Sequence, residues 1–288
     1  MTQDRFYSNI VGIPPEEADT IIRPHNYSVK LLLVDLVRHR RIFRNLLVRD
    51  IRRQYIDLKL GFVWVFSQPV IMTLIFTLLH RGSGAKVVTE IPYPLYLLSG
   101  FLFWFTWADA WRTTASADRT NAALISKVFF PRLYSPLAAA CSRVLAFGIC
   151  LIPISLLMAG LGIYPTWTVV FLPFIVLQAL ILAFSLGLIF ALLAMKSRDW
   201  DRVQGQVLYL GLFVSPVIYS VQTIAAPLRA VYSVNPMVGL LDAFRASVTG
   251  LGSFPWGNWG YSCAVTLVLF LCAVYAFRKT EARMLDEL

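Results

Sequence analysis

Long apolar blocks are the feature that most constrains what this chain can fold into. Six blocks of 17 to 29 residues carry few or no charged side chains, and they cover residues 61–80, 95–114, 137–160, 167–195, 203–219 and 259–277. A helix needs about 20 residues to cross the ~30 Å hydrocarbon layer of a membrane. Lipid offers no partner for an open backbone hydrogen bond, which disfavours isolated strands. The blocks therefore predict an all-α membrane protein with six transmembrane helices.

Composition agrees with that class. The chain of 288 residues is 58% hydrophobic and 15% charged, whereas soluble domains are about 45–50% apolar and about 25% charged. Prolines 69, 153, 173 and 216 lie inside the blocks, and each favours a kink because it removes a backbone donor. The expected organisation is a cytoplasmic N-terminal segment at 1–59, a six-span domain at 60–277 and a cytoplasmic tail at 278–288.

The basic residues predict the orientation of the chain. If both ends are cytoplasmic, 21 of the 26 Lys and Arg residues fall on the inner side, and only Arg81, Lys86, Arg229 and Arg245 fall outside. This is a strong positive-inside bias. The formal net charge of +10 therefore reflects topology, and we expect no nucleic-acid partner.

No metal or cofactor site is expected in this chain. The four cysteines lie inside predicted spans, where they act as small buried hydrophobes. No Cys or His pair has the spacing of zinc ligands. Residues 1–57 show no short apolar core followed by a small-residue cleavage site, so the first span is the expected insertion signal.

The segment before the first span has two faces. At 100° per residue between positions 36 and 59, one face is apolar and the other is basic. The apolar face carries Leu36, Phe43, Leu46, Leu47, Ile51 and Leu58, and the basic face carries Arg38, Arg41, Asn45, Arg49, Arg52 and Lys59. This pattern predicts an amphipathic helix on the inner membrane surface, in contact with membrane lipids. The alternative is a basic stretch that only sets topology.

A series of motifs carries a family resemblance over roughly residues 28–250. In chain order, the motifs are Leu47-Val-Arg-Asp-Ile-Arg-Arg-Gln-Tyr55, Leu60-Gly61, Trp64, Pro69, Ile91-Pro-Tyr-Pro-Leu95, Ser99-Gly100, Lys127-Val-Phe-Phe-Pro-Arg132, Pro136-Leu137, Ser197-Arg-Asp199, Ser215-Pro-Val-Ile-Tyr219, Asn235-Pro-Met237 and Phe244-Arg245. Their ordered set closely resembles ABC-2 type polysaccharide export permeases, which move O-antigen, capsule or teichoic-acid chains across the bacterial inner membrane.

The resemblance implies a division of labour between subunits. In that family two copies of the permease form the pore as a homodimer, and two copies of a separate ATPase subunit dock beneath and carry ATP and Mg. This chain contains no Gly-x-x-x-x-Gly-Lys-Ser/Thr loop, the phosphate cradle of such ATPases. We therefore expect a permease that is not itself an enzyme.

Two cytoplasmic segments are candidates for receiving force from the ATPase. The interface helix contributes Arg49, Asp50, Arg53 and Tyr55. The 112–136 loop combines charges with an apolar ridge, a mixture suited to an interface, and its candidate coupling residues are Arg119, Leu124, Ile125, Lys127, Phe129, Phe130 and Arg132. In the family the corresponding loop carries the coupling helix. The alternative is an ordinary solvated connector.

Aromatic residues in the second span suggest a substrate path. Trp104, Trp107 and Trp111 fall at i, i+3 and i+7 on one face. With Phe103 they form what we call the tryptophan ladder, which could stack on sugar rings. Tyr209, Phe213 and Tyr219 in the fifth span could complete the lining. The alternative is an interfacial aromatic belt combined with helix packing.

The segment between spans five and six is predicted to form re-entrant or interfacial helices, because its apolar part is too short to cross a membrane. The family resemblance implies that it belongs to a periplasmic gate, with Asn235, Pro236, Phe244 and Arg245 as candidate residues.

Charged residues near the spans have structural readings. Asp109 and Arg143 lie in spans and are costly in lipid, so pairing across helices, or snorkelling to the cytoplasmic surface, is expected. Asp199-Trp-Asp201 superficially resembles a glycosyltransferase metal motif, but its place in a short loop favours helix capping.

The overall hypothesis is an ATP-driven exporter of a lipid-linked polysaccharide. The alternatives are a passive channel or secondary transporter and, third, a membrane glycosyltransferase.

Overall fold

The computed structural model describes residues 40–56, 61–83, 90–122, 132–221, 229 and 232–286. Within these ranges every regular element is a helix and no strand occurs, so the all-α prediction is confirmed for the described residues. The elements are α3 (Arg40–Ile51), the π-helical turn η2 (Arg52–Ile56), α4 (Gly61–Ser83), α5 (Tyr93–Thr120), α7 (Tyr134–Ser142), α8 (Val144–Leu161), the 3₁₀ turn η3 (Trp167–Phe171), α9 (Leu172–Lys196), α10 (Asp199–Val214), α12 (Pro236–Thr249) and α13 (Trp256–Asp286). Residues 41–281 form one compact unit.

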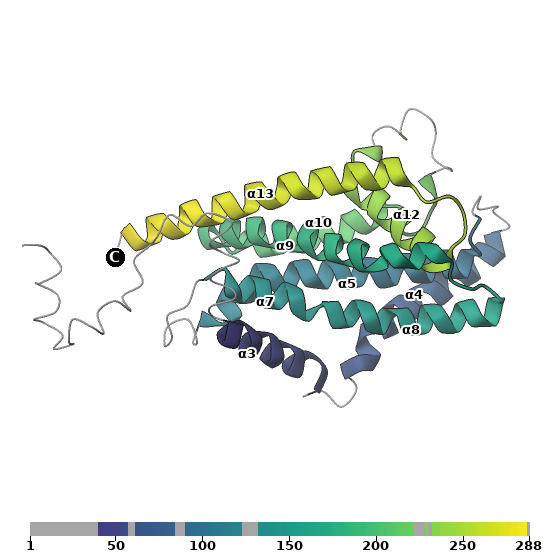
Figure 1. Ribbon diagram of the computed structural model, residues 1–288, viewed down its shortest axis with the longest axis horizontal. Coiled ribbons are helices and arrows are strands. Elements are labelled where there is room, and N and C mark those ends of the chain that lie inside the picture. The colour runs from purple at the N-terminus through teal and green to yellow at the C-terminus, as the bar shows by residue number, and fades with distance from the viewer. Residues whose placement is uncertain are drawn as a thin grey trace, which may run out of the picture. The chain divides into compact units, whose positions relative to one another are not determined.

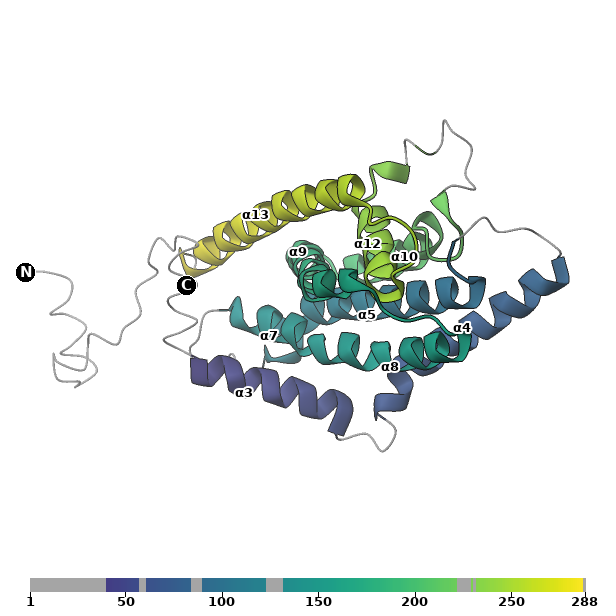
Figure 2. The ribbon, with the colours of Figure 1, turned by 45° about the vertical axis from the view of Figure 1, so that its right-hand side comes forward.

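The long helices run back and forth along one axis. Figures 1 and 2 show α4, α5, the pair α7 and α8, α9, α10 and α13 alternating in direction. Three helical stretches in the described residues are long and apolar enough to cross a membrane: Tyr134–Leu161, Trp167–Lys196 and Trp256–Thr280. The count of six spans stays a prediction, as does the placement of α3 at a membrane surface.

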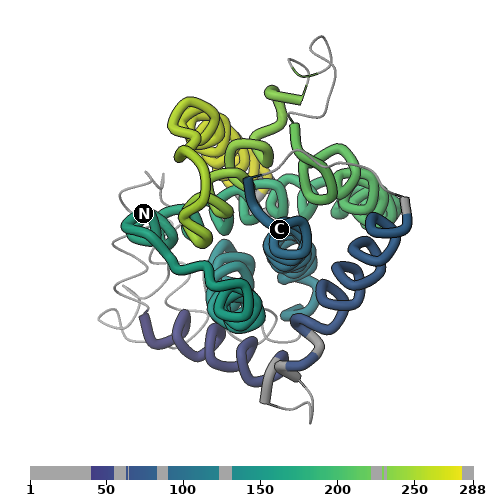
Figure 3. Tube along the Cα trace, turned by 90° about the vertical axis from the view of Figure 1, so that its right-hand side faces the viewer, coloured from purple at the N-terminus to yellow at the C-terminus, as the bar shows by residue number. Residues whose placement is uncertain are grey.

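Helix α5 is the centre of the bundle. It contacts α4, α7, α8, α9, α10 and α12, and Figure 3, which looks along the bundle, shows it surrounded by its neighbours. Leu95, Phe101 and Phe103 on this helix are fully buried. Helix α5 also carries the polar residues Ser99, Thr106 and Thr114, which are all buried. Because polar side chains in a span usually face the bundle interior, the sequence of α5 agrees with its central position.

The helix bounds differ from the predicted spans in two informative places. Helix α5 continues to Thr120, into the predicted 112–136 loop. In this polar stretch the hydroxyls of Thr113, Ser116 and Thr120 donate to carbonyls of the preceding turn. Helix α10 ends at Val214, five residues before the predicted end of the fifth span at 219. Pro216 explains this early end, since the residue before a proline avoids the helical region.

The third predicted span is divided by a break. The chain leaves the helix at Arg143, between α7 and α8. The predicted sixth span continues as helix beyond residue 277, into the predicted tail. These differences concern the ends of helices and one break within a span. The order of the long helices along the chain follows the order of the apolar blocks.

Helix α12 occupies the segment predicted to be re-entrant or interfacial. Asn235 caps it by accepting a hydrogen bond from the Met237 N–H, and Pro236 occupies its first turn. Both are favoured helix-start residues. Gly250 ends it with φ of 66°, a left-handed conformation that glycine adopts without strain. Nearly all of α12 is buried, packed against α5, α9 and η3.

Candidate functional site

The bundle has two ends with different chemistry. We call the end formed by α3, η2, the last turns of α5, α7 and the start of α10 the α3 end. The opposite end, formed by α12, the start of α5 and residues 215–221, is the α12 end (Figure 1). Polar and charged side chains gather at the α3 end, and one buried arginine organises the α12 end.

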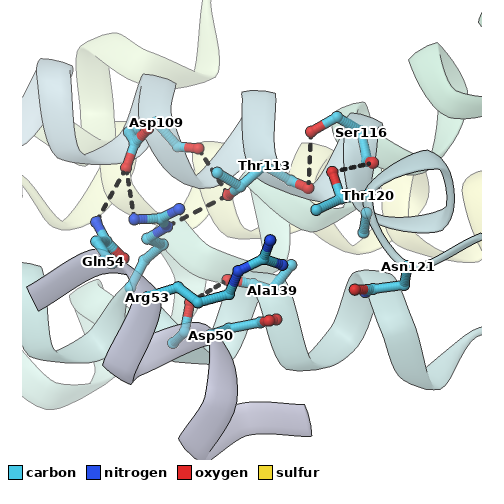
Figure 4. A pocket seen from close by; sticks show the side chains of 12 residues that line it. Asp50, Arg53, Gln54, Asp109, Thr113, Ser116, Thr120, Asn121 and Ala139 are labelled. Atoms are coloured by element: carbon cyan, nitrogen blue, oxygen red, sulfur yellow. Dashed lines mark hydrogen bonds and ion pairs between the residues drawn. The ribbon is translucent and has the colours of Figure 1, made fainter. Parts of the chain in front are cut away.

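A polar cavity of roughly 370 Å³ lies at the α3 end (Figure 4). Its lining comes from α3, η2, α5, α7 and the break after α7, and consists of Asp50, Arg53, Gln54, Asp109, Thr113, Ser116, Ala117, Thr120, Asn121, Ala139, Ser142 and Arg143. Two of the predicted interface-helix residues, Asp50 and Arg53, are therefore part of one concave site. The side chain of a third, Tyr55, lies outside the described residues.

An ion pair forms the inner wall of this cavity. Arg143 Nη1 lies 2.9 Å from Asp109 Oδ2, which confirms the predicted pairing across helices. The guanidinium also donates to Thr113 Oγ1 at 3.3 Å, and Gln54 Nε2 reaches Asp109 Oδ2 at 3.5 Å (Figure 4). Arg143 sits at the break between α7 and α8, so the pair fixes that break against α5.

Asn121 forms a second junction at the α3 end. Its side-chain oxygen accepts a hydrogen bond of 2.5 Å from Arg49 on α3. Its amide nitrogen donates to Ser135 Oγ on α7 at 2.6 Å, and Arg49 also pairs with Asp50 at 2.9 Å. Asn121 is buried. The predicted interface helix and both sides of the predicted coupling loop therefore meet at one side chain.

The central part of that coupling loop lies outside the described residues. Leu124, Ile125, Lys127, Phe129 and Phe130 all fall there, so their predicted role stays a prediction. Of the remaining candidates, Arg132 lies in the turn before α7, and Arg119 is described below.

Arg119 joins the end of α5 to the start of α10. Its guanidinium makes two hydrogen bonds to the carboxylate of Asp201, one of them 2.6 Å between Nη2 and Oδ1. These bonds hold the pKa of Asp201 below its usual value and raise the pKa of Arg119. The predicted capping by Asp199 or Asp201 is wrong, because the N-cap residue of α10 is Arg198, which makes no side-chain capping bond. The Ser197 Oγ accepts from the Asp199 N–H at 3.2 Å. Asp199 and Asp201 occupy the first turn, where carboxylates suit the helix dipole.

At the α12 end, Arg245 is almost completely buried and ties three segments together. Its Nη1 donates to the Pro216 carbonyl at 2.7 Å, and its Nη2 donates to the carbonyls of Val217 at 3.1 Å and Tyr96 at 3.3 Å. The guanidinium carbon lies 3.6 Å from the centre of the Tyr96 ring. Asp242 Oδ1 lies 3.7 Å away, which supplies a counter-charge.

The other predicted gate residues lie around this arginine. Asn235 Nδ2 donates to Ser215 Oγ at 3.1 Å, so the cap of α12 also contacts the residue after α10. The rings of Phe244 and Phe103 lie 4.7 Å apart. The Tyr96 hydroxyl donates to the carbonyls of Pro216 and Tyr219 at 3.1 and 2.8 Å. The structure thus brings the gate candidates together, and their gating role stays a prediction.

Comparison with known proteins decides the family. The profile described as ABC-2 type transporter matches residues 41–249. The chain belongs to the ABC-2 type transporter family. The matched range includes both the α3 end and the α12 end of the bundle, so the two sites described above are parts of an ABC-2 membrane domain.

Similar proteins with assigned roles belong to polysaccharide export systems. The chain is 28% identical over 217 residues to the O-antigen export system permease protein RfbA of Myxococcus xanthus. This alignment covers 75% of this chain and 83% of the relative. It is 23% identical over 239 residues to the capsule polysaccharide export inner-membrane protein CtrC of Neisseria meningitidis, covering 82% and 89%. BexB of Haemophilus influenzae, another capsule polysaccharide export inner-membrane protein, is 21% identical over 238 residues, covering 80% and 88%.

In this ABC-2 chain the tryptophan ladder lies inside the subunit. Phe103, Trp104, Trp107 and Trp111 are all buried, and successive indole rings are 5.1 and 5.4 Å apart. In this conformation the ladder packs helices together. The indole N–H groups of Trp107 and Trp111 are nevertheless buried without an acceptor among the described residues, which packing alone does not explain. Contact with substrate stays a prediction for the ladder.

The other path candidates face differently. Tyr209 and Phe213 on α10 are exposed, with ring centres 5.6 Å apart. Tyr219 lies beyond the end of α10, where its hydroxyl donates to the Phe213 carbonyl at 2.7 Å. Trp104 of α5 packs close to Gly211 of α10. The buried ladder and the exposed aromatic residues Tyr209 and Phe213 therefore lie on different sides of α10.

Sequence reasoning gave no role to several residues that the structure places in these sites. Tyr96 and Gly100 at the start of α5 lie against Arg245, although Ser99-Gly100 was among the family motifs. Ser135 joins α7 to Asn121, which was among the polar residues of the predicted coupling loop. A possible signal was a polar residue in an otherwise helical, membrane-adjacent stretch, since such a residue needs a partner when buried.

Proposed function

We propose that this chain is the permease subunit of an ATP-driven exporter that moves a lipid-linked polysaccharide across the bacterial inner membrane. The family match over residues 41–249 carries the proposal. The relatives named above, which align over more than three quarters of their own length, are permease or inner-membrane proteins of O-antigen or capsule export. A membrane subunit that binds no nucleotide and depends on a separate ATPase, with ATP and Mg on that partner, fits this role.

The α3 end is the proposed site of coupling to the ATPase. Arg49, Asn121 and Ser135 join the interface helix to both sides of the 122–131 segment through bonds of 2.5 and 2.6 Å. A push on that segment would therefore act on α3, α5 and α7 together. The Arg119–Asp201 pair extends the connection to α10, so four helices would respond to one contact.

The proposed exporter is a homodimer with its substrate path between two copies. The exposed face of α10, with Tyr209 and Phe213, supports this arrangement because exposed aromatic rings can stack on sugar rings without tight directional demands. We call Arg245 and the residues whose carbonyls it binds, Tyr96, Pro216 and Val217, the Arg245 cluster. This cluster would close the periplasmic side of such a path, because it holds α12, the start of α5 and residues 215–219 in one unit. Both chain ends would lie in the cytoplasm.

Co-purification and ATP turnover test the function as a whole. The chain should co-purify with a P-loop ATPase, and ATP turnover by the complex should rise when lipid-linked polysaccharide is added. A passive channel or a secondary transporter would bind no such ATPase. A membrane glycosyltransferase would instead consume nucleotide sugar. Failure to find an ATPase partner, with export intact, would refute the proposal.

A matched pair of variants tests the coupling site. Asn121→Ala removes both the Arg49 and the Ser135 contacts and should lower export per ATP hydrolysed. Thr280→Ala is the control, because the Thr280 hydroxyl donates to the Ala276 carbonyl of its own helix and Thr280 is not part of the cavity lining. Equal export coupling in the two variants would argue against a role for this junction.

A further inference from the structure

The cavity at the α3 end contains a cation without a partner. Arg53 lines the cavity (Figure 4) and, among the described residues, makes no hydrogen bond or ion pair. The other arginine of the lining, Arg143, is held by Asp109 and Thr113. A guanidinium offers five N–H donors in a planar fork that matches phosphate oxygens. The free donors of Arg53 are therefore available to an anion that enters the cavity.

The carboxylates of the cavity do not cancel this charge. Asp50 pairs with Arg49 at 2.9 Å, and Asp109 pairs with Arg143 at 2.9 Å. Arg44 and Arg52 line a groove on α3 and η2 together with Arg49 and Arg53, and Arg53 is shared with the cavity. Five arginines therefore face two carboxylates across the cavity and the groove. The surplus of positive charge favours an anionic ligand.

Hydroxyl groups in the cavity lining can also contact a ligand. The hydroxyls of Ser116 and Thr120 donate to backbone carbonyls of their own helix, and each keeps lone pairs that can accept. The lining therefore suits a ligand that carries hydroxyl groups beside its negative charge.

An apolar surface begins next to the cavity. Val144 and Leu145 directly follow Arg143, and both side chains are exposed. Ile152 and Leu156 are exposed farther along the same helix, α8. A ligand with its charged group in the cavity could lay a hydrocarbon chain along α8. This combination of a cation, hydroxyl acceptors and an adjoining apolar face is the chemistry of a lipid headgroup site.

We propose that the α3-end cavity binds a hydroxylated phosphate carried on a lipid, with Arg53 contacting the phosphate and the hydroxyl oxygens of Ser116 and Thr120 accepting from ligand hydroxyls. This chemistry has two sources, a membrane phospholipid such as phosphatidylglycerol and a lipid-linked sugar. The proposal deepens the proposed function by naming a lipid site at the coupling end. It rests on that function only for the second source.

Native mass spectrometry of the full chain in detergent tests the site without export or ATP turnover. The probes are phosphatidylglycerol, phosphatidylmethanol, which keeps the phosphate and lacks the glycerol hydroxyls, phosphatidylcholine with the same acyl chains, and farnesyl phosphoryl glucose. Phosphatidylglycerol or farnesyl phosphoryl glucose should be retained over phosphatidylcholine. Phosphatidylmethanol should be retained less than phosphatidylglycerol. Retention of farnesyl phosphoryl glucose alone would identify the lipid-linked sugar as the source, and retention of phosphatidylglycerol would identify the phospholipid.

Three variants locate the binding. Arg53→Gln should lower the apparent affinity for the retained lipid about tenfold, equivalent to about 1.4 kcal/mol. Arg52→Gln is the matched control, because Arg52 is the preceding residue, carries the same charge and lines only the adjoining groove. Its affinity should fall much less than that of Arg53→Gln. Ser116→Leu keeps every charge and narrows the cavity, so it should also weaken binding if Arg53→Gln fails to fold.

Two results would overturn the proposal. Equal losses in Arg53→Gln and Arg52→Gln would mean that lipids are attracted by the basic face of α3 as a whole. Retention of the anionic probes no better than phosphatidylcholine would mean that the cavity does not select an anionic phosphate headgroup. Either result leaves ATPase partnership and export untouched, so failure here is distinguishable from failure of the proposed function.

Discussion

Gly100→Ala should destabilise the α12 end by crowding Arg245. A Cβ at position 100 would lie 2.9 Å from the Val217 carbonyl oxygen and closer still to Arg245 Nη2. The carbonyl belongs to a backbone held by Arg245 itself and by the Tyr96 hydroxyl bonds to Pro216 and Tyr219. Neither neighbour can withdraw without breaking a bond, so a single added methyl group has a large effect.

The magnitude follows from the bonds that Nη2 makes. Moving this nitrogen weakens its hydrogen bonds to Val217 and Tyr96, and a hydrogen bond from a charged group contributes about 1.5–3 kcal/mol. Replacing a mid-helix glycine with alanine recovers about 1 kcal/mol of helix propensity. The expected net loss is about 2 kcal/mol, and an overpacked site commonly costs about 1–3 kcal/mol.

Thermal unfolding in detergent, followed by tryptophan fluorescence, measures this loss. The control is Gly148→Ala in α8, where an added Cβ meets nothing within 4 Å and only the gain in helix propensity remains. Gly100→Ala should unfold about 5 °C below the wild type, and Gly148→Ala should unfold at or above it. If the two variants unfold together, the Arg245 cluster is not the tight junction described here.

Three further substitutions have expected outcomes. Asp201→Asn removes the Arg119 pair, a loss of at most about 1 kcal/mol for an exposed pair. Bonding to Arg119 lowers the folded-state pKa of Asp201. The pair therefore stabilises the fold fully above the ordinary carboxyl pKa, and this stabilisation is lost as the pH falls through the lowered pKa. In unfolding scans from pH 7 to pH 3, the stabilities of wild type and variant should converge. Asp109→Asn leaves the buried Arg143 without its carboxylate and should lower the free energy of unfolding in denaturant by about 1–3 kcal/mol. Adding Arg143→Gln to this variant should restore part of the loss, and no restoration would contradict the pairing. Trp107→Ala should lower unfolding free energy by about 3–5 kcal/mol, whereas normal stability with lost export would favour contact with substrate.

The apolar blocks predict the helices better than they predict their ends. A block reports that a segment is too apolar for water, but the helix end depends on local backbone chemistry. Pro216 ends α10 early, and α5 continues to Thr120 through a polar stretch whose hydroxyl groups are bonded within the helix. Both effects involve one or two residues, which an average over about 20 residues conceals.

The sites were predictable where residues had to be paired. Asp109 and Arg143 are costly in lipid unless paired, so their contact follows from charge and depth. The sequence could not tell whether the tryptophan ladder faces a path or the interior, because an aromatic stripe has the same spacing in both cases. The roles of Tyr96 and Asn121 depend on contacts with Arg245 and Arg49, and these pairs are 149 and 72 positions apart.

Helix α5 connects the two ends of the bundle. At the α3 end it carries Asp109, which is paired to the α7–α8 break, and it ends beside Asn121, which is bonded to α3. At its other end Tyr96 is bonded to the segment after α10 and lies against Arg245 of α12. Buried side chains in close-packed surroundings leave the helix little room to bend. In the proposed exporter, displacement of the α3 end would therefore reach the Arg245 cluster as a movement of the whole helix, and opening the α12 end would require that cluster to move with α5 or to break.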